Sequence, residues 1–291
     1  MNTNVTALRD ADAPVYSYWQ AVWMSFFSPR LYVDVGKRWK GLGLVYFLLL
    51  TAVAAIPVAV HVGVRFNAYF DNTVLKPLES LPPLYIQNGS VVVDRPMPWR
   101  ITGEDGKVVG VIDTTGKITS FSDTDPGTTF LVTKNRLMLQ FPQPHFFDNF
   151  PLEYGAAREI QLPLDDAGSQ MFVVKDWADQ SGLGSIKWFS MITIYPILVG
   201  VIYFFFLLMM LSVSLIGQLM SSLFLRFQLT WPVASRLVMV AVTPAMLAFM
   251  TLIALNIYFP GIGFLMVCIF AIYFFFGAIA LKRESMGIAL G

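Results

Sequence analysis

Four long apolar runs, separated by more polar segments, set the pattern of this 291-residue chain. The runs cover residues 41–62, 188–216, 233–258 and 261–281. As helices rising about 1.5 Å per residue, each is long enough to cross the roughly 30 Å hydrocarbon layer of a bilayer. None contains Asp, Glu or Lys, and Arg236 lies near one end of the third run. Because a charge at the centre of a bilayer is strongly disfavoured, the pattern predicts four transmembrane helices.

A polar insert, residues 63–187, separates the first apolar run from the other three. It opens with a partial helical face, which Pro77 is expected to end. Short alternating segments then predict strands at 84–87, 90–93, 107–112, 117–121, 129–133 and 136–141, with 170–182 as strand or helix. Asn88-Gly89 is a strong hairpin signal. The insert is therefore predicted to be a β-rich domain, formed by one sheet or a partly closed barrel.

Aromatic and apolar residues recur at helical spacing between positions 15 and 27, ahead of the first run. This predicts one amphipathic helix, ended by Ser28-Pro29, which either lies on the membrane face or packs against the helix bundle. Residues 1–14 resemble a disordered tail. The expected regions are thus 1–14, an interfacial region 15–40, a first helix 41–62, the β-rich domain 63–187, helices 188–281 and a tail 282–291.

Basic residues are placed asymmetrically around the apolar runs. They form three clusters, namely Arg30 to Lys40 before the first run, Arg226 and Arg236 flanking the turn between the second and third, and Lys282 and Arg283 after the fourth. The positive-inside rule places all three on one side of a four-span chain. We therefore expect a multi-pass membrane protein with both termini cytoplasmic and residues 63–187 extracytoplasmic, in a periplasm or at a cell surface, the first run being a retained signal anchor. Trp39, Trp188 and Trp231 begin spans and are expected at the headgroup boundary.

Composition narrows the possible chemistry. The mean hydropathy of +0.61 is too high for a soluble protein, and a net charge of +1 without a basic stripe argues against nucleic acid. A single cysteine, Cys268, permits neither a disulfide within the chain nor a thiolate metal site. His61 and His145 lack ligand spacing, and the acidic segments 122–127 and 165–166 fit turns better than calcium sites. No catalytic motif occurs, so we expect no enzyme, no metal and no cofactor.

Two stretches carry a family resemblance. Residues 26–32 (FFSPRLY) leading to 39–43 (WKGLG), together with 85–89 (YIQNG) and 111–114 (VIDT), resemble a bacterial membrane family catalogued as domain of unknown function 1189. More distantly, Arg236 through Thr243-Pro244 looks like a helix of the Yip-type membrane superfamily, although the large insert departs from that pattern. The candidate functional or structural residues are Pro29, Asn88, Gly89, Asp113, Arg236 and Pro244.

The functional hypotheses follow from this architecture, because the family implies no activity. The leading one is a non-enzymatic envelope protein whose β-rich domain binds a partner protein, a lipid or an envelope polymer. The alternative is a permease or lipid-handling component in which helices kinked at Pro196 and Pro244 line a path. A membrane-bound hydrolase is the least favoured. The lipid bilayer is a partner in each case, and the sequence does not indicate an oligomeric state.

Overall fold

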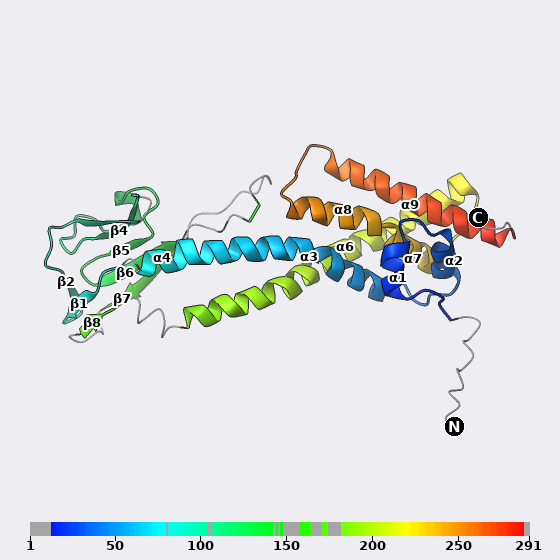
Figure 1. Cartoon of the computed structure of the whole chain (residues 1–291). Helices are drawn as coiled ribbons and strands as arrows, with labels where there is room; N and C mark the ends of the chain where they lie inside the picture. Colours follow the sequence, from blue (N-terminus) through cyan, green and yellow to red (C-terminus); the bar gives the residue numbers. More distant parts are fainter. Residues whose placement is uncertain are drawn as a thin grey trace, which may run out of the picture. The chain divides into compact units, whose positions relative to one another are not determined.

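The computed structural model describes residues 13–79, 81–103, 106–141, 144, 146–147, 158–164, 170–173 and 182–287 (Figure 1). Its chain forms two compact units. The helical unit comprises residues 1–60 and 195–291, and the β unit comprises residues 61–194. The expected tail up to residue 12, His145 and Asp165-Asp166 lie outside the described residues.

Two sheets form the β unit (Figure 1). The smaller has the order β2-β1-β8, from β1 (Leu84–Gln87), β2 (Ser90–Val92) and β8 (Gln170–Phe172). The larger has the order β3-β4-β5-β6-β7, from β3 (Trp99–Thr102), β4 (Val108–Ile112), β5 (Phe130–Val132), β6 (Arg136–Phe141) and β7 (Arg158–Pro163). All neighbouring strands are antiparallel except β4 and β5.

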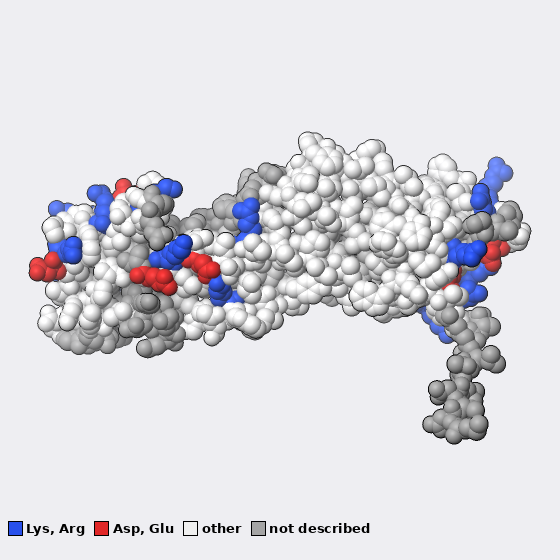
Figure 2. All heavy atoms as spheres, viewed as in Figure 1, with Lys and Arg blue, Asp and Glu red and all other residues white. Residues whose placement is uncertain are grey.

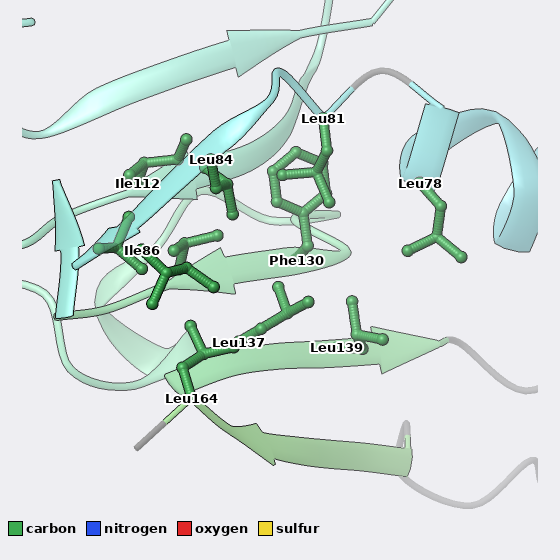
Figure 3. Packing of buried hydrophobic residues seen from close by; sticks show 11 residues of the cluster. Leu78, Leu81, Leu84, Ile86, Ile112, Phe130, Leu137, Leu139 and Leu164 are labelled. Carbon is green, nitrogen blue, oxygen red and sulfur yellow. The ribbon is translucent and has the colours of Figure 1, made fainter. Parts of the chain in front are cut away.

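One apolar cluster is shared by both sheets (Figure 3), and a smaller one, formed by Val111, Ile118, Leu131 and Met138, belongs to the larger sheet and the loop after β4. Leu84 and Ile86 of β1 enter the shared cluster from the smaller sheet, and Ile112, Phe130 and Leu137 enter it from the larger. Gly110 is required for this packing, since a Cβ atom there would overlap the ring of Phe130. The shared core explains how the unit holds together without a disulfide.

The strand predictions are confirmed in part. Both expected hairpins form, β1-β2 and β5-β6, and Asn88 and Gly89 each adopt a positive φ in the first turn, at 52° and 71°. The strand expected at 117–121 is wrong, because these residues form a loop followed by the 3-10 turn Phe121–Asp123. The expectation of one sheet is also corrected to two. Strands β3 and β7 were not predicted.

Among the residues that the structure describes, four helical stretches are long and apolar enough to cross a membrane: Leu44–Glu79, Leu183–Leu225, Trp231–Ala254 and Ile262–Ser285. The chain therefore has the architecture of a multi-pass membrane protein. The first stretch joins α3 (Leu44–Tyr69), a π-helical turn (Phe70–Leu75) and α4 (Lys76–Glu79). Pro77 lies inside α4, so the helix ends two residues later than predicted.

Burial differs sharply among the other three stretches. In the most apolar 18-residue segment of α6 (Leu183–Leu225), only 11% is buried. The corresponding segment of the third stretch is 61% buried. That third stretch is divided at Val242 into α7 (Trp231–Ala241) and α8 (Thr243–Ala254), with Pro244 in the first turn of α8. Together with α9 (Ile262–Ser285), it supplies much of the buried surface of the helical unit. The break at Pro244 is the expected effect of a missing backbone N–H.

The segment before α3 forms two helices where the sequence predicted one. The first, α1 (Tyr18–Met24), begins with a capping box between Ser17 and Gln20. The second, α2 (Pro29–Lys37), begins at Pro29, whose fixed φ and missing N–H suit the first turn of a helix. Residues 31–36 of α2 are all buried, and α2 packs against α7 and α9. Pro29 thus separates the two helices by starting the second.

Candidate functional site

Buried polar groups join the segment between α2 and α3, and the first turn of α3, to the broken span α7-α8. Ser235 donates a hydrogen bond to the Leu42 carbonyl at 3.0 Å, and the hydroxyls of Tyr46 and Thr243 are 2.6 Å apart. Arg236 lies beside Ser235 on α7 and completes this polar seam. Its members hydrogen-bond within apolar surroundings, where an unpartnered polar group is strongly destabilising.

Arg236 is held by backbone carbonyls rather than by a carboxylate. Its guanidinium donates to the carbonyls of Trp39 and, at 3.2 Å, Gly36. These carbonyls lie at the C-terminal end of α2, where a helix leaves carbonyl groups without intrahelical partners and carries partial negative charge. Arg236, only 8% exposed, therefore caps α2. Its Nε atom has no hydrogen-bond partner among the described residues.

Asp34, on the other side of α2, ties the N-terminal segment to the helical unit. Its carboxylate accepts the backbone N–H of Val15 at 3.0 Å and of Tyr16 at 3.2 Å. The guanidinium of Arg38, one helical turn further on, donates to the same carboxylate at 3.2 Å. Asp34 is 1% exposed, so its charge is compensated inside the protein.

An open pocket of about 350 Å³ lies along this face of α2. Its lining residues come from the chain before α1, from α2 and from the end of α9, and they are Val15, Tyr16, Arg30, Val33, Asp34, Arg38 and Glu284. Arg30, Asp34 and Arg38 recur every four residues and share one helix face. The exposed guanidinium of Arg30 makes no ion pair or hydrogen bond with any residue that the structure describes.

The three basic clusters meet at this end of the helical unit. Lys37 pairs with Glu284 at 3.0 Å, which joins α2 to the end of α9. Lys282 donates to the Leu225 carbonyl at the end of α6 at 2.8 Å. Figure 2 shows Lys and Arg gathered at this end, next to a helix surface that is almost free of charge. The grouping that the charge pattern predicted is therefore present in the fold.

Aromatic side chains project from α1 at the same end. Trp19 and Trp23, one turn apart, are 65% and 73% exposed, and Phe27 is also exposed. Trp39, which the sequence placed at the headgroup boundary, is instead buried and packs edge-on against Tyr18 at 4.8 Å. The exposed indoles of this end thus come from α1.

A second open pocket, of about 360 Å³, lies by the C-terminal part of α6. Its polar lining consists of Gln218, Ser222 and Gln228. Pro196 and Pro244 line neither pocket. Pro196 is exposed within a continuous α6, and Pro244 is buried.

In the β unit, the outer face of the smaller sheet exposes an apolar row. Tyr85 of β1 lies directly opposite Val92 of β2 on one side and Met171 of β8 on the other. The three side chains are 61%, 50% and 52% exposed, respectively. Because directly opposed residues on one face of a sheet are close neighbours, they form a continuous apolar strip.

Asp113, another candidate residue, organises the turn after β4. Its buried carboxylate accepts hydrogen bonds from the Thr115 hydroxyl at 2.6 Å, the Thr115 N–H at 2.9 Å and the Ile118 N–H at 2.6 Å. Burial acts to raise the pKa of Asp113, but these hydrogen bonds outweigh it and lower the pKa. The role of Asp113 is structural, because every hydrogen-bond donor to its carboxylate belongs to the same turn.

The candidate residues do not form one site. Pro29, Arg236 and Pro244 belong to the helical unit, whereas Asn88, Gly89 and Asp113 belong to the β unit. His61 is bound to the Phe146 carbonyl at 2.8 Å. Sequence reasoning missed the pocket along α2, although the spacing of Arg30, Asp34 and Arg38 was a signal for it once that segment is taken as a helix.

Comparison with known proteins gives one match. Residues 19–278 match the model of a family described as protein of unknown function (DUF1189). The chain belongs to this family. The match includes residues of both units of the DUF1189 chain, covers its first three candidate spans and ends within the fourth. Neither the curated proteins nor the solved structures contain a match.

Proposed function

We propose that this DUF1189 protein is a non-enzymatic component of the bacterial cell envelope, anchored in the cytoplasmic membrane by its helical unit and binding another envelope protein through its β unit. The orientation has both termini in the cytoplasm and residues 63–187 outside. What supports it is the meeting of the three basic clusters at one end of the helical unit, since basic residues of short loops stay on the cytoplasmic side.

The observation that carries the binding role is the apolar row Tyr85, Val92 and Met171 on the smaller sheet. Aromatic residues and Met are enriched in the centres of protein interfaces, and a contiguous exposed apolar patch is typical of an interaction surface. The row crosses all three strands, of which β2 and β8 are the edge strands of this sheet. On β2 the N–H of Val91 is already bonded to the Lys134 carbonyl at 2.8 Å, so β8 is the edge considered for pairing with a partner chain. An edge strand offers unpaired backbone groups to a partner chain.

Site-specific photo-crosslinking in cells tests this binding role. A photoreactive amino acid at position 85 of the full chain is expected to give one discrete adduct with an envelope protein. The matched control carries the same amino acid at position 160, because Ile160 is 47% exposed on β7 of the other sheet. The substitution Val92→Asp is expected to abolish the adduct from position 85.

Two results would contradict the proposal. One is the same set of abundant proteins captured from positions 85 and 160. The other is an adduct that survives Val92→Asp unchanged. Crosslinks to lipid or to an envelope polymer alone would replace the protein partner with one of those binding modes.

A permease is the less favoured proposal, because Pro196 and Pro244 line neither open pocket. We also propose a distant relation between this protein and the Yip-type membrane superfamily. Its support is the helix break that follows Arg236 at Thr243-Pro244.

A further inference from the structure

We propose that the pocket along α2 binds the phosphodiester headgroup of an anionic membrane lipid. The inference is independent of what the β unit binds. It rests on three observations. The guanidinium groups of Arg30 and Arg38 line the pocket, protein donors already offset the negative charges of the nearby carboxylates, and α1 exposes aromatic side chains.

The two guanidinium groups are arranged to hold an anion. Arg30 in the first turn of α2 and Arg38 at its C-cap lie eight residues apart on one face, which separates their backbones by about 12 Å. Both side chains line the same pocket, so long, flexible arginines can converge on one headgroup. Arg30 has no partner among the described residues, and Arg38 uses one of its N–H donors for Asp34. Guanidinium groups bind phosphate oxygens with paired hydrogen bonds.

The acidic residues of the pocket are already occupied. The carboxylate of Asp34 accepts two backbone N–H groups as well as Arg38, and Glu284 pairs with Lys37 at 3.0 Å. Their negative charge is therefore offset by protein donors. Since the side chain of Ser28 does not cap α2, the positive end of its helix dipole adds to the charge of Arg30.

A membrane lipid fits this pocket better than a free anion. Trp19, Trp23 and Phe27 are exposed and follow Val15 and Tyr16 of the pocket wall closely in the sequence. Exposed indoles next to basic residues are typical of a helix lying in the headgroup layer of a bilayer. The volume of about 350 Å³ falls within the range of small-molecule sites, and basic pockets at the ends of transmembrane helices bind anionic headgroups.

Native mass spectrometry of the full chain in detergent tests the proposal. The probes are phosphatidylglycerol, zwitterionic phosphatidylcholine and inorganic phosphate. We expect phosphatidylglycerol to remain bound and Arg30→Gln to weaken its binding about fivefold, because one basic residue near an anionic lipid contributes about 1 kcal/mol. Arg30→Lys is expected to restore part of the affinity.

The matched control is Lys40→Gln, since Lys40 is exposed at the same end and does not line the pocket. Arg30 is exposed and makes no hydrogen bond or ion pair with described residues, so its variants are expected to keep the melting temperature of the unsubstituted chain. Equal weakening by Lys40→Gln would overturn the pocket in favour of a diffuse charge effect. Equal binding of phosphatidylcholine would overturn anion recognition, and displacement by millimolar inorganic phosphate would overturn the assignment to a lipid.

Discussion

At the scale of single residues, Arg236 shows how a charge is accommodated in an apolar helix bundle. Its guanidinium caps α2 from a different helix, through carbonyls of residues about 200 positions earlier. Arg236→Met leaves these carbonyls without donors, and each unsatisfied buried acceptor is destabilising by about 1–3 kcal/mol. We expect a loss of about 2 kcal/mol in unfolding free energy, measured by denaturation in detergent.

Two further variants test whether Arg236 stabilises the fold by hydrogen-bonding the carbonyls of α2 or only by carrying a positive charge. Arg236→Lys is expected to lose less than Arg236→Met, since an ammonium keeps the charge but lacks the fork that reaches two carbonyls. Arg283→Met is the control, because Arg283 is exposed. If Arg236→Met unfolded like the unsubstituted chain, Arg236 would not act as a cap.

Gly277 of α9 sets how closely α2 approaches. A Cβ atom at this position would overlap the ring of Tyr32, whose hydroxyl donates to the Ser25 carbonyl at 2.8 Å. Burial raises the pKa of Tyr32, which keeps this donor neutral. Gly277→Ala is expected to destabilise the helical unit by about 1–3 kcal/mol through overpacking. Thermal unfolding in detergent measures the change.

The same helix provides a matched control for this variant. At Gly263 no heavy atom lies within 4 Å of the place that a Cβ atom would occupy, so Gly263→Ala is expected to leave stability unchanged or to raise it slightly. Equal melting temperatures for the alanine variants at positions 277 and 263 would refute the close approach of α2 and α9.

At the scale of elements, the turn after β4 depends on the ionised carboxylate of Asp113. Because its pKa in the fold is lower than its ordinary value of 3.8, the charged form stabilises the fold above that value. This stabilisation is lost as the pH falls through the lowered pKa. Hydrogen exchange of β4 and β5 amides in the full chain between pH 5 and 2.5 measures it.

Asp113→Asn supplies the comparison for that turn. The amide keeps an acceptor for the Thr115 N–H but carries no charge, so stability at pH 5 is expected to fall. The loss of stability at low pH that comes from protonation of Asp113 is expected to be absent in this variant. An unchanged pH profile would show that other carboxylates control the acid stability of the β unit.

Elements differ in how well the sequence predicts them, and the reason is the range of their contacts. The Asn88-Gly89 hairpin is local, so two residues specify it. Strand β8 pairs with β1 across more than 80 residues, and β7 has no short turn joining it to β6. The helix α2 was missed because it is short and contains Asp34, whose partners are backbone groups. Hydrogen bonds to backbone leave no pattern in a sequence.

At the scale of the whole molecule, the number of spans was predictable because hydropathy depends only on local composition. The candidate site, the pocket along α2, was not predictable from the sequence. This pocket forms only where α2, α9 and the chain before α1 pack together, and the residue pattern within one segment does not predict such a tertiary contact. Basic clusters came closest, since they indicated that these segments share one side of a membrane.

Topology is the prediction that belongs to this scale. An export-dependent reporter inserted after Leu164 is expected to be active, and the same reporter after Gly287 is expected to be inactive, because basic residues of short loops remain cytoplasmic. Enzyme activity in intact cells measures both, with a cytoplasm-dependent reporter at the same positions as the reciprocal control. Activity after Gly287 and silence after Leu164 would reverse the orientation.

The order of synthesis gives the Arg236 cap one more consequence. At about 5–20 residues per second, a ribosome that has completed Gly36 reaches Arg236 roughly 10–40 s later. Through that interval the C-terminal carbonyls of α2 lack their guanidinium donor, and the α2 face that packs on α7 and α9 is uncovered. During synthesis, α2 therefore cannot have its folded packing partners until the residues of α7 and α9 have been made.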